Sequence, residues 1–312
     1  ECEIKSRDVC IAYSKSAHYN NVPRIQVKGA EFRPISFTSL NGLYPFYEYL
    51  AVRSKLKTIS KFWSEEFEEL WAQNLWAPAV VGSFNGNTRY YLRDELSFNL
   101  RENYSRGAKK YLKGLYYISE SPAFGVYCND NVYAIEKADE LISNSEFMRS
   151  TVLKKFGRDS KVILPSINKK ELLEGFNKFK SQVKDRDRRI VLIGDSIVKG
   201  IETVQWLADR LCSENFAIYG RAYSSERIVG NISYRPWESD VSKIYASAKM
   251  VLVPSIWQEA YGRVAAEAEL LRVPCLVRRV GGLPEAVGYK ETKICDDDFD
   301  FLRKLKKVLN NV

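Results

Sequence analysis

The second half of the sequence alternates short apolar runs with amphipathic stretches, and this alternation constrains the fold more than any other feature. Continuous apolar runs of four to six residues are typical of strands that are buried on both faces. We expect such strands at residues 189–194, 216–219, 250–255 and 274–279. Helical spacing predicts intervening helices at residues 203–211, 239–248 and 261–271. Strands that alternate with helices predict an α/β fold with a parallel sheet, whose ligands bind beyond the carboxyl ends of the strands.

The first half gives a sparser pattern. Val9–Tyr13 and Ala79–Ser83 are short apolar runs that we interpret as strands, and Phe62–Trp76 has apolar residues at helical spacing. A further strand, LIS, is followed by Asn144–Ser145, which form a helix cap with Glu146 just inside the helix. This helix is expected to end near Gly157.

Chain length predicts two domains, because 312 residues correspond to roughly two domains of ~150 residues each. Residues 169–188 are dense in charged side chains and are interpreted as a solvated linker region. We therefore place an N-terminal domain at residues 1–165 and a C-terminal domain at residues 166–312.

Cysteine spacing and hydropathy bear on metal binding and on the cellular location of the chain. None of the six cysteines is paired at C-x-x-C spacing, so we expect no zinc or redox cluster, and the pattern fits a reducing, cytoplasmic location. The sequence has one histidine, His18, so a histidine-rich metal site is excluded. No run of 18 apolar residues and no signal-peptide core is present. Because the sequence starts at Glu1 without methionine, a removed leader stays an open alternative.

The net charge of +9 is spread over both halves of the sequence. An even spread argues against a dedicated nucleic-acid-binding domain and predicts a weak attraction to anionic partners. The densest basic stretch is residues 101–118, with five basic residues, one acidic residue and several aromatic ones. Two readings stay open for it: a face that contacts a membrane or an anionic acceptor, and an ordinary solvated helix face.

Residues 250–288 contain the pattern that predicts a ligand-binding site. The strand that ends at Pro254 leads through a short loop into a helix that begins near Gly262. The free amides and partial positive charge of that helix start suit a diphosphate. Glu259 and Glu267, eight residues apart, can face one crevice, and carboxylates accept the hydroxyl hydrogen bonds of a hexose or a ribose.

A second tight helix start follows one strand later. Gly281 and Gly282 precede Leu283–Pro284–Glu285, and proline suits the first position of a helix. Two helix N-termini can then converge on the same crevice.

These residues together resemble the donor-binding half of the retaining GT-B glycosyltransferases, in particular the large glycogen-synthase-like and sucrose-synthase-like family. That family's signature is a strand ending in Pro-Ser, then Glu, seven residues and Glu, and then Gly-Gly-Leu-Pro-Glu. The resemblance covers residues 240–288 well and residues 132–165 moderately. It implies two Rossmann-like domains that face each other across a cleft, with a nucleotide-diphosphate sugar bound mainly to the second domain.

The resemblance also implies functions for individual residues. Glu259 and Lys199 become the candidate catalytic residues, Glu259 on the donor sugar and Lys199 on the departing diphosphate. Glu267 would bind the ribose. The remaining candidate donor-binding residues are Gly194, Ala260, Tyr261, Gly262, Arg263, Val264, Gly281, Gly282 and Arg221.

One position departs from the family pattern. Asp195 stands near the place where the family usually has an arginine, so Arg263 or Arg221 is expected to supply the missing positive charge. The resemblance implies sugar transfer with retention of configuration, without a metal or other cofactor, as in polysaccharide biosynthesis. The acceptor is a glycan, a lipid-linked molecule or a small molecule, and peripheral membrane contact stays open. The alternatives are a catalytically silent nucleotide-sugar-binding protein and, less favoured, a nucleic-acid-binding protein.

Overall fold

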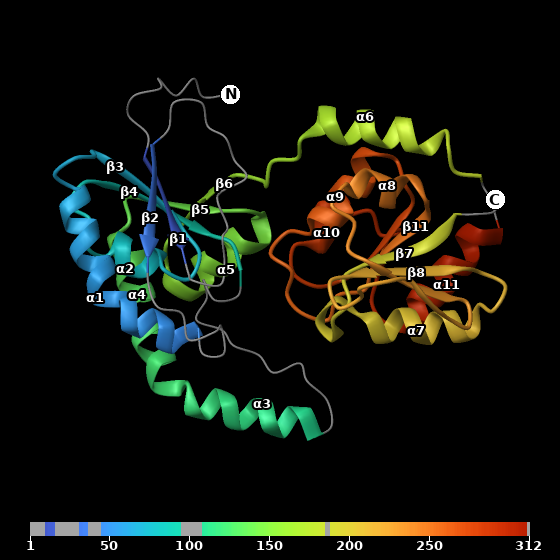
Figure 1. The fold of residues 1–312 in the computed structure, drawn as a ribbon, viewed down its shortest axis with the longest axis horizontal. Helices are drawn as coiled ribbons and strands as arrows, with labels where there is room; N and C mark the ends of the chain where they lie inside the picture. Colours follow the sequence, from blue (N-terminus) through green and yellow to red (C-terminus); the bar gives the residue numbers. More distant parts are fainter. Residues whose placement is uncertain (1–9, 16–30, 37–44, 95–107, 185–187, 311–312) are drawn as a thin grey trace. The chain divides into compact units, whose positions relative to one another are not determined.

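The computed structural model describes residues 10–15, 31–36, 45–94, 108–184 and 188–310 (Figure 1). The chain forms two compact units, one made of Glu1–Leu92 and Tyr111–Ile142 and the other of Arg93–Lys110 and Ser143–Val312. The predicted boundary between residues 165 and 166 stays a prediction. His18 and residues 101–107 lie outside the described residues.

A seven-stranded sheet forms the centre of the second unit, in the order β13-β12-β11-β7-β8-β10-β9. All neighbouring strands are parallel except β9, which runs antiparallel to β10 at the edge. The strands are β7 (Arg189–Ile193), β8 (Phe216–Gly220), β9 (Arg227–Val229), β10 (Ile232–Pro236), β11 (Ala248–Val253), β12 (Cys275–Arg278) and β13 (Ile294–Cys295). The predicted α/β class with a parallel sheet is confirmed.

Helices cover both faces of this sheet (Figure 1). The alternation along β11 shows why, since Val251 and Val253 enter one apolar core while Met250 and Leu252 enter the other. The first core includes side chains of α6, α8 and α9, and the second includes side chains of α7 and α11. The helical segments from residue 146 onward are α5 (Glu146–Phe156), α6 (Lys169–Lys180), η3 (Ile197–Lys199), α7 (Ile201–Arg210), α8 (Val241–Ala246), α9 (Arg263–Leu270), α10 (Leu283–Ala286) and α11 (Asp298–Asn310).

The first unit is built around a smaller set of strands and helices. A parallel pair, β1 and β2, is separate from a sheet in the order β3-β4-β5-β6. The strands of this unit are β1 (Cys10–Lys15), β2 (Glu31–Ser36), β3 (Glu69–Gln73), β4 (Asn87–Leu92) and β5 (Glu140–Ser143), while β6 (Lys161–Val162) falls in the second unit. The helices are α1 (Pro45–Trp63), α2 (Ala77–Val81), α3 (Ala108–Ser119) and α4 (Ser121–Lys137). Across the described residues, no helix combines the length and the apolar character needed to cross a membrane.

Three predictions about local structure are wrong. The expected helix at Phe62–Trp76 is the end of α1 followed by strand β3. The expected strand at Ala79–Ser83 is the helix α2, which has Pro78 in its first turn. The expected linker at residues 169–188 contains α6, whose buried Leu172 and Phe176 pack into the core of the second unit.

Candidate functional site

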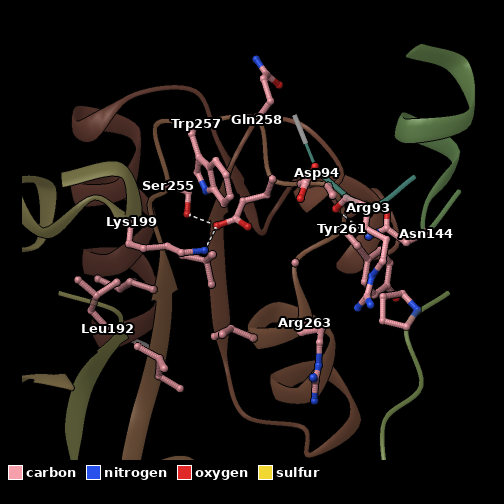
Figure 2. Close-up of a pocket in the computed structure, with 18 residues that line it drawn as sticks. Arg93, Asp94, Asn144, Leu192, Lys199, Ser255, Trp257, Gln258, Tyr261 and Arg263 are labelled. Carbon is pink, nitrogen blue, oxygen red and sulfur yellow. Dashed lines mark hydrogen bonds and ion pairs between the residues drawn. The ribbon is translucent and has the colours of Figure 1, made fainter. Parts of the chain in front are cut away.

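A pocket of about 270 Å³ lies at the carboxyl ends of β7 and β11, where the sequence predicts the ligand site (Figure 2). Its floor includes the last residues of both strands, Leu192–Ile193 and Leu252–Val253. Seven of the predicted site residues line it, namely Lys199, Glu259, Ala260, Tyr261, Gly262, Arg263 and Val264. The loop between β11 and α9 therefore supplies one wall, as the sequence pattern indicates.

Lys199 and Glu259 form an ion pair inside this pocket, although 60 residues separate them in the sequence. The Lys199 ammonium donates to Glu259 Oε1 at 2.6 Å, and the Ser255 hydroxyl donates to the same oxygen at 2.7 Å (Figure 2). The Glu259 side chain is largely buried, with 12% exposure, while 35% of the Lys199 side chain is exposed. The ammonium can therefore reach a ligand without leaving its carboxylate partner.

Eleven of the residues that line the pocket lie outside the predicted set, and they include Trp257, Gln258 and Asn144. Trp257 lies beside Lys199, whose ammonium is 5.0 Å from the centre of the indole ring. Among the described residues, the buried Trp257 Nε1 and Asn144 Oδ1 atoms have no hydrogen-bond partner. Gln258 lines the same wall. Trp257 and Gln258 lie in the loop IWQEAY, and this position could have identified them as site residues. Nothing in the sequence links Asn144 to this loop.

The start of α9 brings backbone amides to the pocket. Gly262 is the N-cap residue in a left-handed conformation, and Arg263 and Val264 follow as the first helical residues. Arg263 also bonds to the next turn of the helix, because its Nη2 donates to Glu267 Oε1 at 3.0 Å. The Arg263 side chain is 61% exposed, and the residue lines the pocket.

Glu267 is buried and is not among the residues that line the pocket. Its Oε2 accepts a hydrogen bond from the Tyr245 hydroxyl at 2.7 Å. Burial and the neighbouring Glu267 carboxylate raise the pKa of Tyr245 well above its usual value, so the phenol stays a donor. The predicted contact of Glu267 with a ribose stays a prediction.

The diglycine holds the loop that carries Glu259. Gly282 N donates to the Glu259 carbonyl at 2.7 Å, and Gly281 N donates to Gln258 Oε1 at 2.8 Å. A Cβ at Gly281 would lie 2.1 Å from the Glu259 carbonyl oxygen, and one at Gly282 would lie 2.5 Å from the Ala260 carbonyl oxygen. The two glycines are therefore required for close backbone packing, and neither lines the pocket.

Gly194, Asp195 and Arg221 also lie outside the pocket lining. Gly194 makes room for the Lys199 stem, since a Cβ there would lie 2.9 Å from Lys199 Cγ. Asp195 Oδ2 accepts from Ala222 N at 2.7 Å and packs against Gly220, so this carboxylate secures the loop after β8. The Arg221 guanidinium lies 5.5 Å from the centre of the Trp237 ring. Of the two predicted sources of positive charge, Arg263 is the one that lines the pocket.

The start of α5 is joined to the same loop system. The Ser145 hydroxyl caps α5 by accepting from Met148 N at 3.0 Å, and it donates to the Ala260 carbonyl. The Glu285 carboxylate accepts from the backbone amide of Glu146 at 2.9 Å. Glu285 belongs to the GGLPE sequence, yet it is absent from the predicted site residues, because a helix cap supplied from a distant segment leaves no local pattern.

Comparison with known proteins agrees with this geometry. Residues 160–311 match the family model described as glycosyl transferases group 1. The D-inositol 3-phosphate glycosyltransferase of Corynebacterium diphtheriae is 34% identical over 116 residues, which cover 37% of this chain. The chain spans about a quarter of the length of that curated relative, 24%.

Two solved structures show the same fold at low sequence identity. The sucrose-phosphate synthase from Thermosynechococcus elongatus is 15% identical, with a TM-score of 0.68 over 96% of this chain and 79% of that chain. HepE from Anabaena, in complex with UDP and glucose, is 15% identical, with a TM-score of 0.58 over 90% of this chain and 76% of that chain. These structures show that the chain has the α/β fold of the GT-B glycosyltransferases, and the match to the family model covers residues 160–311.

Proposed function

We propose that this chain carries the donor site of a retaining glycosyltransferase, which moves a sugar from a nucleoside diphosphate sugar to a hydroxyl acceptor. The observation that carries the proposal is the Lys199–Glu259 ion pair in the pocket, beside the first amides of α9. Helix amides and an ammonium attract a diphosphate, and a fixed carboxylate accepts hydrogen bonds from sugar hydroxyls. The expected site is therefore complementary to both the diphosphate and the sugar of a nucleotide sugar.

Glu259 is proposed to orient the donor sugar. A carboxylate has about four acceptor positions, and the bonds from Lys199 and Ser255 use two of them on one oxygen. The carboxylate can thus accept sugar hydroxyls while it keeps the Lys199 ammonium in place.

Lys199 and Arg263 are proposed to stabilise the leaving group. The bond between the anomeric carbon and the diphosphate oxygen breaks, and a bond from the same carbon to the acceptor oxygen forms on the same face. The acceptor proton passes to the departing diphosphate. Positive groups fixed around the charge that develops on that diphosphate lower the barrier. Because these two side chains supply that charge, we propose that the reaction needs no metal.

A donor screen tests this proposal. We expect one of the UDP-, GDP-, ADP- and dTDP-sugars to raise the thermal midpoint, and a ligand at 100 times its dissociation constant stabilises the fold by about 2.7 kcal/mol. UDP-glucose is tested first, because the solved structure of HepE contains UDP and glucose. The variant Glu259→Gln should weaken the response to the sugar nucleotide more than the response to the free nucleotide. No stabilisation by any donor contradicts the proposed site.

The acceptor and the stereochemistry are tested with the identified donor. Glycans, lipid-linked sugars and small polyols are candidate acceptors, and D-inositol 3-phosphate joins the screen because of the relative's name. The anomeric proton signals of the product report its configuration, and an inverted product contradicts the retaining reaction.

A second candidate function is a catalytically silent protein that binds nucleotide sugars. It is favoured by Asp195, which follows β7 near the place where the resembled family usually has an arginine, and which instead secures the loop after β8. Tight donor binding without transfer or donor hydrolysis, in the parent and in Glu259→Gln alike, would favour this second function.

A further inference from the structure

Arg278, the last residue of β12, joins three elements of the second unit that are far apart in the sequence. Its Nε donates to the Pro254 carbonyl at 3.2 Å, directly after β11. Its Nη2 donates to Thr203 Oγ1 at 3.0 Å, in the first turn of α7, and to the carboxylate of Asp298, the first residue of α11. The planar fork of a guanidinium suits these contacts, because it presents several donors in fixed directions.

Two of these contacts lie next to the segments that carry the Lys199–Glu259 ion pair. Pro254 precedes the loop that contains Glu259. Thr203 lies four residues after Lys199, the last residue of η3. The Arg278 side chain is only 12% exposed and does not line the pocket. Any influence of Arg278 on the pocket must therefore pass through the two segments that it contacts.

The same two segments also contact each other through their backbones. The Ile256 amide donates to the Val198 carbonyl at 3.0 Å. A Cβ at Gly200 would lie 2.2 Å from the Pro254 carbonyl oxygen, so only glycine allows the start of α7 to approach this closely. The Pro254 carbonyl thus contacts both the Gly200 backbone and the Arg278 guanidinium. This one peptide group fixes the two segments to each other.

The surroundings of Arg278 tolerate the loss of its charge. Thr203 Oγ1 donates to Asp298 Oδ1 at 2.9 Å, and the Arg278 guanidinium lies 5.4 Å from the centre of the Phe301 ring. The Asp298 side chain is 39% exposed, so water can solvate its carboxylate when the guanidinium is removed. Arg278→Met keeps an apolar stem for the contact with Phe301, and we therefore expect this variant to fold.

We propose that Arg278 is a positioning residue for Lys199. By fixing the first turn of α7 to the loop after β11, it keeps the Lys199 ammonium on the Glu259 carboxylate. The inference rests on the proposed function for the reaction that it serves, in which this ammonium stabilises the departing diphosphate. The coupling between Arg278 and Lys199 is measurable without a donor, so the two proposals are tested separately.

Urea unfolding of the full chain tests this coupling in a cycle of Arg278→Met, Lys199→Met and the double variant. Lys199→Met leaves the largely buried Glu259 carboxylate without its ammonium and should raise the unfolding equilibrium constant. That factor should be about fivefold smaller in Arg278→Met than in the parent, because the ion pair is already loosened there. Repulsion between the two positive charges predicts the opposite sign, since its relief would make Lys199→Met less costly in the parent.

Two control variants separate geometry from charge and from simple destabilisation. Arg279→Met removes the neighbouring guanidinium, which pairs with Asp296 at 2.6 Å outside the pocket lining, and its effect should add to that of Lys199→Met. Arg278→Lys keeps the positive charge but loses the fork, and it should resemble Arg278→Met. The inference is overturned if Lys199→Met costs as much stability in Arg278→Met as in the parent, or more.

Inorganic pyrophosphate is the ligand probe, because it tests the diphosphate site without a base or a sugar. Calorimetric titration should show an affinity about threefold to tenfold weaker in Arg278→Met than in the parent, with little further loss when Arg278→Met is added to Lys199→Met. Equal losses in both backgrounds also overturn the inference. A parent chain that binds no pyrophosphate contradicts the proposed diphosphate site, and the unfolding cycle alone then decides the role of Arg278.

Discussion

Lys199 is the residue on which the proposed chemistry depends most directly. Its ammonium is held by Glu259 and lies over Trp257, so its position is fixed before a ligand arrives. A charge that is already in place needs no reorganisation during the reaction, and this makes electrostatic stabilisation effective.

We expect Lys199→Met to lower turnover by about 10²- to 10³-fold at saturating donor, because removal of one such group from an active site has effects of this size. Steady-state transfer or donor hydrolysis measures the change. The control is Lys249→Met, since Lys249 pairs with Glu214 at 2.9 Å with similar exposure and lies outside the pocket lining. Equal turnover in both variants would remove Lys199 from the proposed mechanism.

The elements of the second unit were predictable because they are buried. Continuous apolar runs located β7, β8, β11 and β12 to within a few residues. Such runs are typical of strands that are covered on both faces. The start of α9 was likewise evident from its loop and glycine. What could not be predicted is how distant segments meet, for example the packing of the diglycine on the Glu259 backbone.

The first unit shows where such interpretation fails. Phe67, Leu70 and Trp71 fit a helical period together with Phe62, yet β3 occupies Glu69–Gln73 and exposes Trp71. Short apolar stretches fit either period, so tertiary pairing decides, and here β3 pairs with β4 in parallel. At α2, the apolar residues are buried all round, which hides helical periodicity, and Pro78 was the signal that favoured a helix.

The contact between the diglycine and the Glu259 loop gives a prediction at the level of elements. We expect Gly281→Ala to weaken donor binding and lower the thermal midpoint, because the new Cβ would meet the Glu259 backbone and displace the loop. Gly230→Ala is the matched control, since its φ of 59° resembles the 54° of Gly281 but its Cβ would enter open space.

The control isolates the strain of a left-handed alanine, about 1–2 kcal/mol. Calorimetric titration of the donor nucleotide and thermal unfolding measure both effects. If Gly281→Ala and Gly230→Ala behave alike, close packing of the diglycine is not what positions the loop.

At the scale of the whole molecule, the two units contain different kinds of buried charge. The second unit places one largely buried carboxylate, Glu259, in a pocket, whereas the first unit has buried Asp130 on α4, where it bonds to side chains of α1. Asp130 accepts from the Tyr49 hydroxyl at 2.6 Å, from the Arg53 guanidinium at 2.7 Å and from the Lys57 ammonium at 3.0 Å. Burial opposes ionisation, but the bonds from Arg53, Tyr49 and Lys57 outweigh it and lower the pKa of Asp130.

Because the folded-state pKa of Asp130 lies below its unfolded value, its charge stabilises the fold above the unfolded pKa, about 3.9. That contribution disappears as the pH falls through the lower, folded-state value. We expect Asp130→Asn to reduce the free energy of unfolding by about 1.5–3 kcal/mol at neutral pH, with a smaller difference in acid. Urea unfolding over a pH series measures this.

Two results accompany the Asp130→Asn experiment. The control Asp159→Asn breaks an exposed ion pair with Arg149 and should change stability little, because solvent screens it. Donor affinity should be unchanged in Asp130→Asn, because the pocket residues belong to the second unit. A stability difference that grows in acid would contradict the ion-pair assignment.

The ammonium of Lys199 over the indole of Trp257 has a practical consequence. An indole's fluorescence depends on the electric field across the ring, and a cation at 5.0 Å sets much of that field. A diphosphate that draws the ammonium toward itself would change the colour and intensity of this emission. Because the sequence has six tryptophans, the difference in emission between the parent and Trp257→Phe reports on this ring, and titrations can be followed without a label.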